Sequence, residues 1–228
     1  MRLSTTTALG LSALLALTGC STSTEPATAS SSSATPVQEG STAAKASTPL
    51  SSAELSERLL SEGDLGEGYT RTPQSAVRHD DVTVIGCPAL AKLGGDAATG
   101  SSLSFPHKAK ASFTDGGSNN SEVSEELYSD TAAKLSHGIG TVFDAMLSCP
   151  TYQVVSGSTV IDMGTTKASA PALGDEQWSQ LLTYSAGGRR SVVKQTAIRT
   201  GTILVIVSGS PALVDAHLVD AVRTAQAR

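Results

Sequence analysis

The chain has 228 residues, of which 39% are hydrophobic and 4% aromatic, and its formal net charge of -5 is spread along the sequence. It contains no cluster of basic residues, so the charge pattern argues against nucleic acid as a partner. After residue 20 no apolar run approaches the roughly 20 residues that a membrane-spanning helix needs.

The first residues have the pattern of a targeting segment. Arg2 is the only charged residue before Cys20, and residues 8–17, ALGLSALLAL, are almost wholly apolar. That length suits the central region of a secretory signal peptide and is too short to span a bilayer. The segment closes on LTGC at 17–20, which resembles the bacterial lipobox.

This resemblance implies that Cys20 is lipidated. In proteins with the motif, the thiol is alkylated by a diacylglyceryl group and cleavage leaves the cysteine as the first mature residue. We therefore expect residues 1–19 to be a lipoprotein signal peptide. The protein would then lie on the extracytoplasmic face of the cell membrane, with that membrane as a partner through the lipid anchor. The alternative is an ordinary secretory peptide with an unrelated cysteine.

Residues 20–49 are rich in Ser, Thr, Ala and Pro and indicate a disordered linker. Val37 is the only large aliphatic residue between positions 21 and 49. Such a segment buries too little apolar surface to offset the entropy lost on ordering. We expect a flexible tether with a root-mean-square reach of about 30 Å, followed by one folded domain at residues 50–228.

The first half of that domain mixes predicted helices with a hairpin. Ser51 and Glu54 form a capping box for a helix that ends at Gly63. Pro88 and Gly94 suit the first position and the C-terminal cap of a short second helix. Next we expect strands at 107–115 and 121–129 around the loop DGGSNN, then an amphipathic helix capped by Asp130 and ended by Cys149-Pro150.

The second half indicates successive strands and a closing helix. One strand covers residues 151–164, with a bend allowed at Gly157. Short glycine turns join three more strands into an antiparallel meander at 176–186, 189–199 and 202–209. The last of these is apolar almost throughout and should lie centrally. A final helix begins at Ser210-Pro211, with an inward face of Val214, Leu218, Ala221 and Val222.

These elements predict an α+β fold, an antiparallel β-sheet with packed helices in a single domain. Lipidation of Cys20 leaves Cys87 and Cys149 as an even pair, which favours a disulfide outside the cytoplasm. Two buried free thiols are the alternative. No zinc pattern surrounds either cysteine, so no metal is expected.

A family resemblance supports this picture. The segments LLSEGDLGEGYT, GCPALAKLGG, LSCP and GDEQW, followed by RTGTILVIVSG and a closing helix, resemble the extracellular sensor domain of mycobacterial PknH-type serine/threonine kinases and the actinobacterial lipoproteins that share it. The resemblance spans most of residues 50–228. The runner-up is the PsbP-like fold of secreted lipoproteins. Both imply a sheet with helices, a cleft and no established catalysis.

No catalytic constellation is recognisable in the sequence. It lacks a G-x-S-x-G elbow, and the four histidines are scattered, so we expect each of them to be a solvated surface residue. We expect no cofactor and no enzyme activity. Trp178 and Tyr184 are candidates for lining a ligand cleft, against the alternative that they fill the core.

Three functions remain open at this stage. The first is a sensor or binding module for a small molecule or an envelope protein. The second is a structural or docking lipoprotein without a small ligand. The third is an envelope enzyme whose catalytic residues lie far apart in the sequence.

Overall fold

The computed structural model describes residues 48–73, 82–94, 97, 103, 105–117 and 121–227. They belong to a compact unit that extends from Ala44 to Arg228. The predicted signal peptide, Cys20 and nearly all of the predicted linker lie outside the described residues. None of the described helices is both long and apolar enough to span a membrane.

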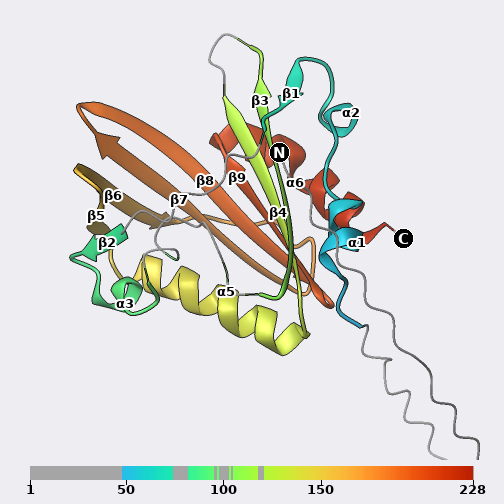
Figure 1. Cartoon of the computed structure of the whole chain (residues 1–228), viewed down its shortest axis with the longest axis horizontal. Coiled ribbons are helices and arrows are strands. Elements are labelled where there is room, and N and C mark those ends of the chain that lie inside the picture. The colour runs from blue at the N-terminus through green and yellow to red at the C-terminus, as the bar shows by residue number, and fades with distance from the viewer. Residues whose placement is uncertain are drawn as a thin grey trace, which may run out of the picture. The chain divides into compact units, whose positions relative to one another are not determined.

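The described strands form one nine-stranded sheet with the order β1-β3-β4-β9-β8-β7-β6-β5-β2 (Figure 1). All neighbouring strands are antiparallel. The strands are β1 (Tyr69–Arg71), β2 (Val82–Ile85), β3 (His107–Asp115), β4 (Glu122–Ser129), β5 (Thr151–Ser156), β6 (Thr159–Lys167), β7 (Glu176–Ala186), β8 (Arg189–Thr200) and β9 (Ile203–Gly209). The predicted meander is therefore confirmed, and its apolar last strand β9 lies inside the sheet.

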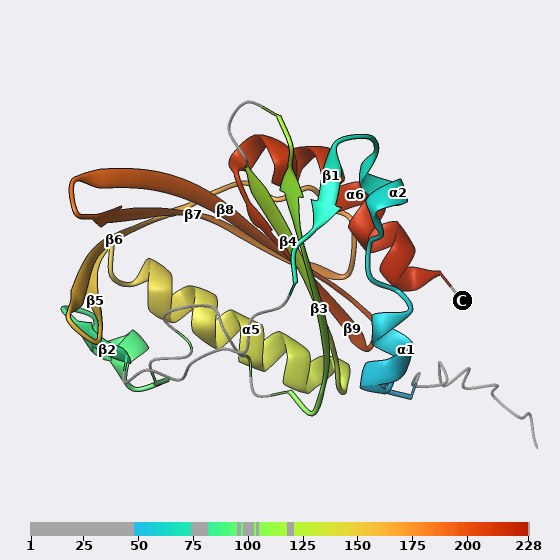
Figure 2. The same cartoon turned by 45° about the horizontal axis from the view of Figure 1, so that its top comes forward.

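Helices pack on both faces of the sheet, which confirms the α+β fold. The described helices are α1 (Ser52–Ser56), α2 (Glu62–Leu65), α3 (Pro88–Ala91), α5 (Ala132–Leu147) and α6 (Pro211–Gln226). Figure 2 shows α6 on one side of the strands and α5 on the other. The predicted inward face of α6 is confirmed, because Val214, Leu218, Ala221 and Val222 are all buried.

The sheet divides into two halves that differ in their cover. In the covered half, α1 and α6 pack on β3, β4 and β9 from one face, and α5 packs on β4, β8 and β9 from the other. In the open half, β7, β6, β5, β2 and the exposed first residues of β8, 189–192, have α5 and α3 on one face only. On the other face of the open half, described side chains such as Val160 and Thr166 are exposed.

The predicted disulfide is confirmed. Cys87 and Cys149 are bonded, with their Cα atoms 5.6 Å apart and 62 positions between them in sequence. The bond joins the start of α3 to the residue that follows the C-terminal cap of α5. Both cysteines are buried in the apolar cluster of the open half, so the covalent link lies where the sheet has helices on one face only.

The predicted helix from Ser51 to Gly63 is wrong in its extent. The capping box of Ser51 and Glu54 is present, but α1 ends at Ser56 and Gly63 lies inside the separate helix α2. The reason lies in β4. The Leu60 N–H donates a hydrogen bond of 2.7 Å to Glu125 Oε2, so the backbone leaves the helical path to satisfy a buried carboxyl group.

Three smaller differences concern chain reversals and edges. The predicted single strand at 151–164 is a hairpin, since Gly157 adopts φ +57° between β5 and β6. Thr131 rather than Asp130 caps α5, and its hydroxyl accepts from the Lys134 N–H. The edge strands β1 and β2 were not predicted, because each is short and pairs with a distant segment.

Candidate functional site

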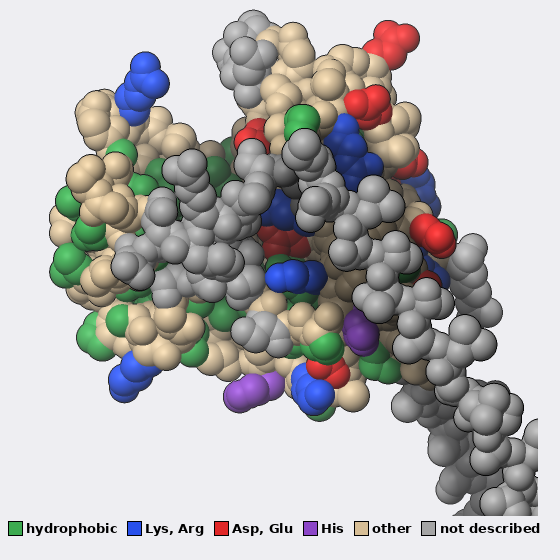
Figure 3. All heavy atoms as spheres, viewed as in Figure 1, with side chains coloured by type: hydrophobic (Ala, Val, Ile, Leu, Met, Phe, Trp, Pro, Cys, Tyr) green, Lys and Arg blue, Asp and Glu red, His purple; other side chains and the backbone are tan. Residues whose placement is uncertain are grey.

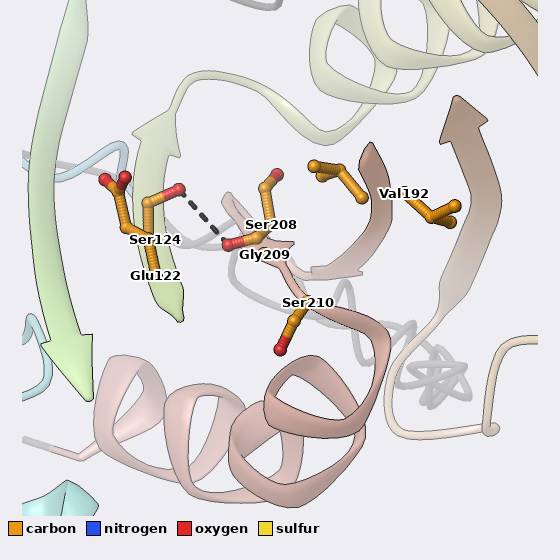
Figure 4. Close-up of a pocket in the computed structure, with 7 residues that line it drawn as sticks. Glu122, Ser124, Val192, Ser208, Gly209 and Ser210 are labelled. Atoms are coloured by element: carbon orange, nitrogen blue, oxygen red, sulfur yellow. Dashed lines mark hydrogen bonds between the residues drawn. The ribbon is translucent and has the colours of Figure 1, made fainter. Parts of the chain in front are cut away.

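A hollow of about 340 Å³ lies where β4, β8 and β9 meet the start of α6 (Figure 4). We call it the serine hollow, because three of its seven lining residues are serines. Glu122 is the only charged residue of the described lining, which comprises Glu122, Ser124, Val192, Val193, Ser208, Gly209 and Ser210. The volume falls within the range of small-molecule sites.

The strand register explains why polar groups collect in this hollow. Ser124 of β4 pairs with Ser208 of β9, and Ser208 pairs with Gln195 of β8. The Ser124 hydroxyl donates to the Ser208 carbonyl oxygen at 3.3 Å, as Figure 4 shows. Next in the same row, the buried Gln180 of β7 donates from Nε2 to Gln195 Oε1 at 3.0 Å.

The close approach of two strands also shapes the serine hollow. A Cβ atom on Gly209 would lie 2.3 Å from the Glu122 carbonyl oxygen, so only glycine fits at this position. Ser210, the residue before α6, makes no side-chain capping hydrogen bond. The hollow therefore offers serine hydroxyls and one carboxylate, groups suited to hydrogen-bonding an uncharged polar ligand.

A second hollow, of about 330 Å³, lies at the turn between β7 and β8. We call it the arginine hollow. Asp162 of β6 contributes the only described carboxylate of its lining, and the Gln153 Nε2 donates to Asp162 Oδ1 at 2.8 Å. The lining comprises Val160, Asp162, Ser185, Ala186, Gly187, Gly188, Arg189 and Arg190.

The two predicted cleft residues line neither of these hollows. Trp178 is partly buried against the apolar cluster formed by α5, β8 and β9. Tyr184 packs against the cluster that contains the disulfide, and burial raises its pKa to about 12. Both side chains therefore contribute to the core on the α5 face, and their role as cleft residues stays a prediction.

His217 differs from the prediction that the histidines are solvated. Only 8% of its surface is exposed, and its Nε2 is 2.8 Å from the Tyr69 hydroxyl. Burial lowers its pKa. The position carries a signal in the sequence, because it falls three residues after Val214 and four before Ala221 on the apolar face of α6. His137, in contrast, is exposed as expected.

These contacts do not assemble a recognisable catalytic site. The hydrogen-bond partner of His217 is a tyrosine rather than a serine, and neither residue lines a described hollow. Within the described ranges, no three His, Cys, Asp or Glu side chains are placed to hold a metal ion.

Glu125 is a buried acid that sequence reasoning missed. It is 1% exposed and lies in the apolar cluster of the covered half, between Val123 and Leu127 on β4. Its Oε1 has no hydrogen-bond partner, while Oε2 accepts from the Leu60 N–H. Removal from water raises the pKa of this carboxyl to about 8. It is therefore largely protonated at neutral pH.

Hydrogen bonds join the segment GDEQW to the segment RTG. Arg199 donates to Asp175 and to Glu176, and the Gly201 N–H donates to Asp175 Oδ2 at 2.8 Å. Glu176 also accepts from the Ser136 hydroxyl of α5. These contacts fasten the segment before β7 to the β8–β9 turn and to α5, so the motif serves the fold.

Charge is mixed on the face that Figure 3 shows. Over the described residues, basic and acidic side chains are interspersed there rather than gathered in one patch of a single sign. The ion pair between Lys110 of β3 and Glu126 of β4 is one example of adjacent opposite charges.

No protein-family model matches the chain, and no curated protein matches it. The structure is similar to the crystal structure of the extracellular domain of PknH from Mycobacterium tuberculosis, with a TM-score of 0.56 and 15% sequence identity. That match covers 77% of this chain and 98% of the other. A second match, to an uncharacterised protein from Mycobacterium smegmatis, has a TM-score of 0.38 and 10% identity over 71% of this chain and 91% of the other.

The PknH match shows the fold. A TM-score above one half across almost the whole of the matched domain confirms the expected PknH-like arrangement of sheet and helices. The Mycobacterium smegmatis match is too distant to support an argument. At these identities neither comparison transfers a ligand or a partner to this chain.

Proposed function

We propose that residues 50–228 form an extracytoplasmic binding domain that captures a small molecule or an envelope partner without catalysis. In this proposal a lipid on Cys20 and the linker at 20–49 hold the domain near the outer face of the cell membrane. The disulfide supports an oxidising location. The fold shared with an extracellular domain supports the same location.

The serine hollow is the observation that carries the proposal. It combines a volume of about 340 Å³ with three serine side chains and a single carboxylate in its described lining. Its floor is the paired sheet, which is rigid, so little ordering is needed when a ligand binds. Neutral ligands with several hydroxyl or amide groups fit this lining best.

A thermal-shift screen against neutral polar envelope metabolites tests this function. A ligand at 100 times its dissociation constant should stabilise the protein by about 2.7 kcal/mol. Ser208→Leu would fill the hollow and should abolish the shift. Ser191→Leu is the matched control, since Ser191 is exposed on β8 and lines neither hollow.

Two results would contradict the small-ligand function. One is a ligand shift that Ser208→Leu and Ser191→Leu leave equally intact. The other is a screen without any shift, together with recovery of one stoichiometric envelope protein by the same domain. The second result would favour the docking alternative.

The lipid anchor has its own test. Metabolic labelling with a clickable fatty acid should mark the wild-type chain and leave Cys20→Ala unmarked. Equal labelling of both chains would show that the lipid, if any, is attached elsewhere. The binding function of residues 50–228 would then need another means of retention at the envelope.

A further inference from the structure

Two hairpins of the open half end at the same side of the sheet. The β5–β6 turn follows the pair Ser156 and Thr159, and the β7–β8 turn follows the pair Ala186 and Arg189. In both Figure 1 and Figure 2 these turns lie together at the left end of the strands. We call this region, with the arginine hollow between the turns, the hairpin end.

Two arginines at the hairpin end have no ionic partner among the described residues. Arg189 and Arg190 are both exposed, and neither forms an ion pair within the described part of the chain. Among the other described cations, Arg199 and Lys194 pair with acidic residues, whereas the exposed Lys108 and Lys167, like the two arginines, form no ion pair with a described residue. The two arginines outnumber Asp162, the one described carboxylate of the arginine hollow, so the hairpin end carries net positive charge on a protein whose net charge is negative.

Exposed valines accompany these arginines. Val160 of β6 is 50% exposed and Val192 of β8 is 41% exposed, although large aliphatic side chains are usually buried. Strand alternation places both valines and Arg190 on the same face, the one that no described helix covers in this half. Val160 lines the arginine hollow and Val192 lines the serine hollow, so cation and apolar surface are combined on one face of the sheet rather than in one hollow.

We propose that the hairpin end docks on an anionic lipid bilayer. Arg189 and Arg190 bind the phosphodiesters of neighbouring headgroups, and Val160 and Val192 enter the interfacial layer. Asp162, an exposed residue in the lining of the arginine hollow, accepts a hydrogen bond from a headgroup hydroxyl, as phosphatidylglycerol provides. The site shares Val192 with the lining of the serine hollow but none of that hollow's serines, and its role is to orient the domain on the membrane surface.

The charge count favours a bilayer over a soluble polyanion. Each basic residue near an anionic membrane strengthens binding by about fivefold, so two arginines give about 25-fold. That is weak for capture from solution, but it is enough to orient a domain already held nearby. A soluble phosphate would leave the two exposed valines without a partner.

Vesicle co-sedimentation tests the docking with the full chain carrying Cys20→Ser, so that no lipid on that cysteine contributes. Vesicles contain either phosphatidylcholine alone or an equal mixture with phosphatidylglycerol. We expect binding to the mixed vesicles only. Arg189→Gln combined with Arg190→Gln should lower the partition coefficient about 25-fold. Val160→Ser should lower it about threefold, because roughly half of a valine side chain is lost from the interface.

A charge-matched control separates docking from net charge. Lys108→Gln combined with Lys167→Gln removes the same charge from two other exposed positions and should change binding by less than about twofold. All variants share the same first 47 residues, so differences between them report the hairpin end. All the substituted side chains are exposed, and circular dichroism with thermal unfolding checks that each variant folds.

Two outcomes would overturn the proposal. Equal losses in the arginine and lysine variants would show that net charge alone attracts the protein to the vesicles. An arginine-dependent thermal shift with inorganic phosphate, without binding to the mixed vesicles, would show a soluble-anion site instead of a docking surface. Loss confined to the arginine and valine variants supports bilayer docking.

Discussion

The covered and open halves of the sheet are stabilised in different ways. In the covered half, α1 and α6 bury an apolar cluster on one face of the sheet that encloses a protonated carboxyl group at Glu125, and α5 packs on a second cluster on the other face. In the open half, one face has only α3 and α5, and the Cys87–Cys149 disulfide fastens those two helices together. Both described hollows reach β8, where the helix cover ends.

This difference connects stability with function. Side chains on the bare face of the open half, such as Val192 and Arg190, are available to a partner because no described helix occupies that face. In the open half the disulfide offsets the stability that a second layer of helices would supply by burying apolar surface. The covered half, in contrast, depends on packing and on keeping one buried acid uncharged.

The largest expected effect tests the buried acid of the covered half. The pKa of Glu125 is about 8 in the folded chain, against 4.5 for the free side chain. Between these values the folded chain retains a proton that the unfolded chain has released, so the free energy of unfolding falls as pH rises. Glu125→Gln removes this titration and should gain stability relative to wild type across that window, by up to about 5 kcal/mol.

Urea denaturation at a series of pH values between about 5 and 9 measures the Glu125 effect. Glu122→Gln is the matched control, because Glu122 is exposed on the same strand and its substitution should leave the pH dependence of wild type unchanged. Parallel pH profiles for wild type and Glu125→Gln would show that the carboxyl group ionises freely in the folded state. The covered half would then not exclude water from this site.

The second prediction removes the covalent link of the open half. On the chain-entropy model, a loop closed across 62 positions contributes about 4 kcal/mol to the free energy of unfolding. Cys87→Ala combined with Cys149→Ala should lower stability by about that amount and make it insensitive to reductant. Hydrogen exchange on the variant should show β5 and β6 losing protection before β4 and β9. Uniform loss across the sheet would contradict the division into two halves.

The third prediction contrasts one aliphatic residue from each half. Leu218 of α6 is fully enclosed by the covered cluster, and Leu218→Ala should cost about 3 kcal/mol through the cavity that it leaves. Val192→Ala on the open half should change the free energy of unfolding by less than about 0.5 kcal/mol, since Val192 is already exposed. Chemical denaturation of both variants measures the contrast. A Val192→Ala cost close to that of Leu218→Ala would mean that the bare face is covered in solution.

Much of this fold was predictable because its strongest signals are local. The helical spacing of apolar residues predicted α5 and α6, and the glycine turns at 187–188 and 201 predicted the meander of β7, β8 and β9. The disulfide was predicted from the number of cysteines, since Cys87 and Cys149 remain as a pair once Cys20 is set aside. Edge strands β1 and β2 escaped prediction, because three or four residues carry no period and depend on their partners.

The candidate site was much less predictable, because the contacts that form it are not local in the sequence. Ser124 and Ser208 form the serine hollow only because β4 pairs with β9 across 84 positions of sequence, and register between distant strands is not encoded locally. Glu125 stands beside Glu126 in a strand, and nothing in that pair shows which carboxyl group is buried. His217 carried a readable signal, its position on the apolar face of α6, but the prediction of a solvated side chain was wrong.

The smallest effect concerns the far edge of the covered half, where the Tyr69 hydroxyl of β1 meets His217 of α6. Tyr69→Phe removes one hydrogen bond and should cost about 1 kcal/mol near neutral pH.

Burial lowers the pKa of His217 below its ordinary 6.5, so the unfolded chain takes up a proton first as pH falls. The free energy of unfolding should therefore decrease below about pH 6.5, and His217→Gln should remove that part of the decrease. His137→Gln, at an exposed position of α5, is the control and should keep the wild-type slope. Denaturation curves that show the same acid-side slope for wild type and His217→Gln would mean that the ring is protonated as easily in the folded chain as in the unfolded chain. The edge of the covered half would then be as open to water as the bare face of the other half.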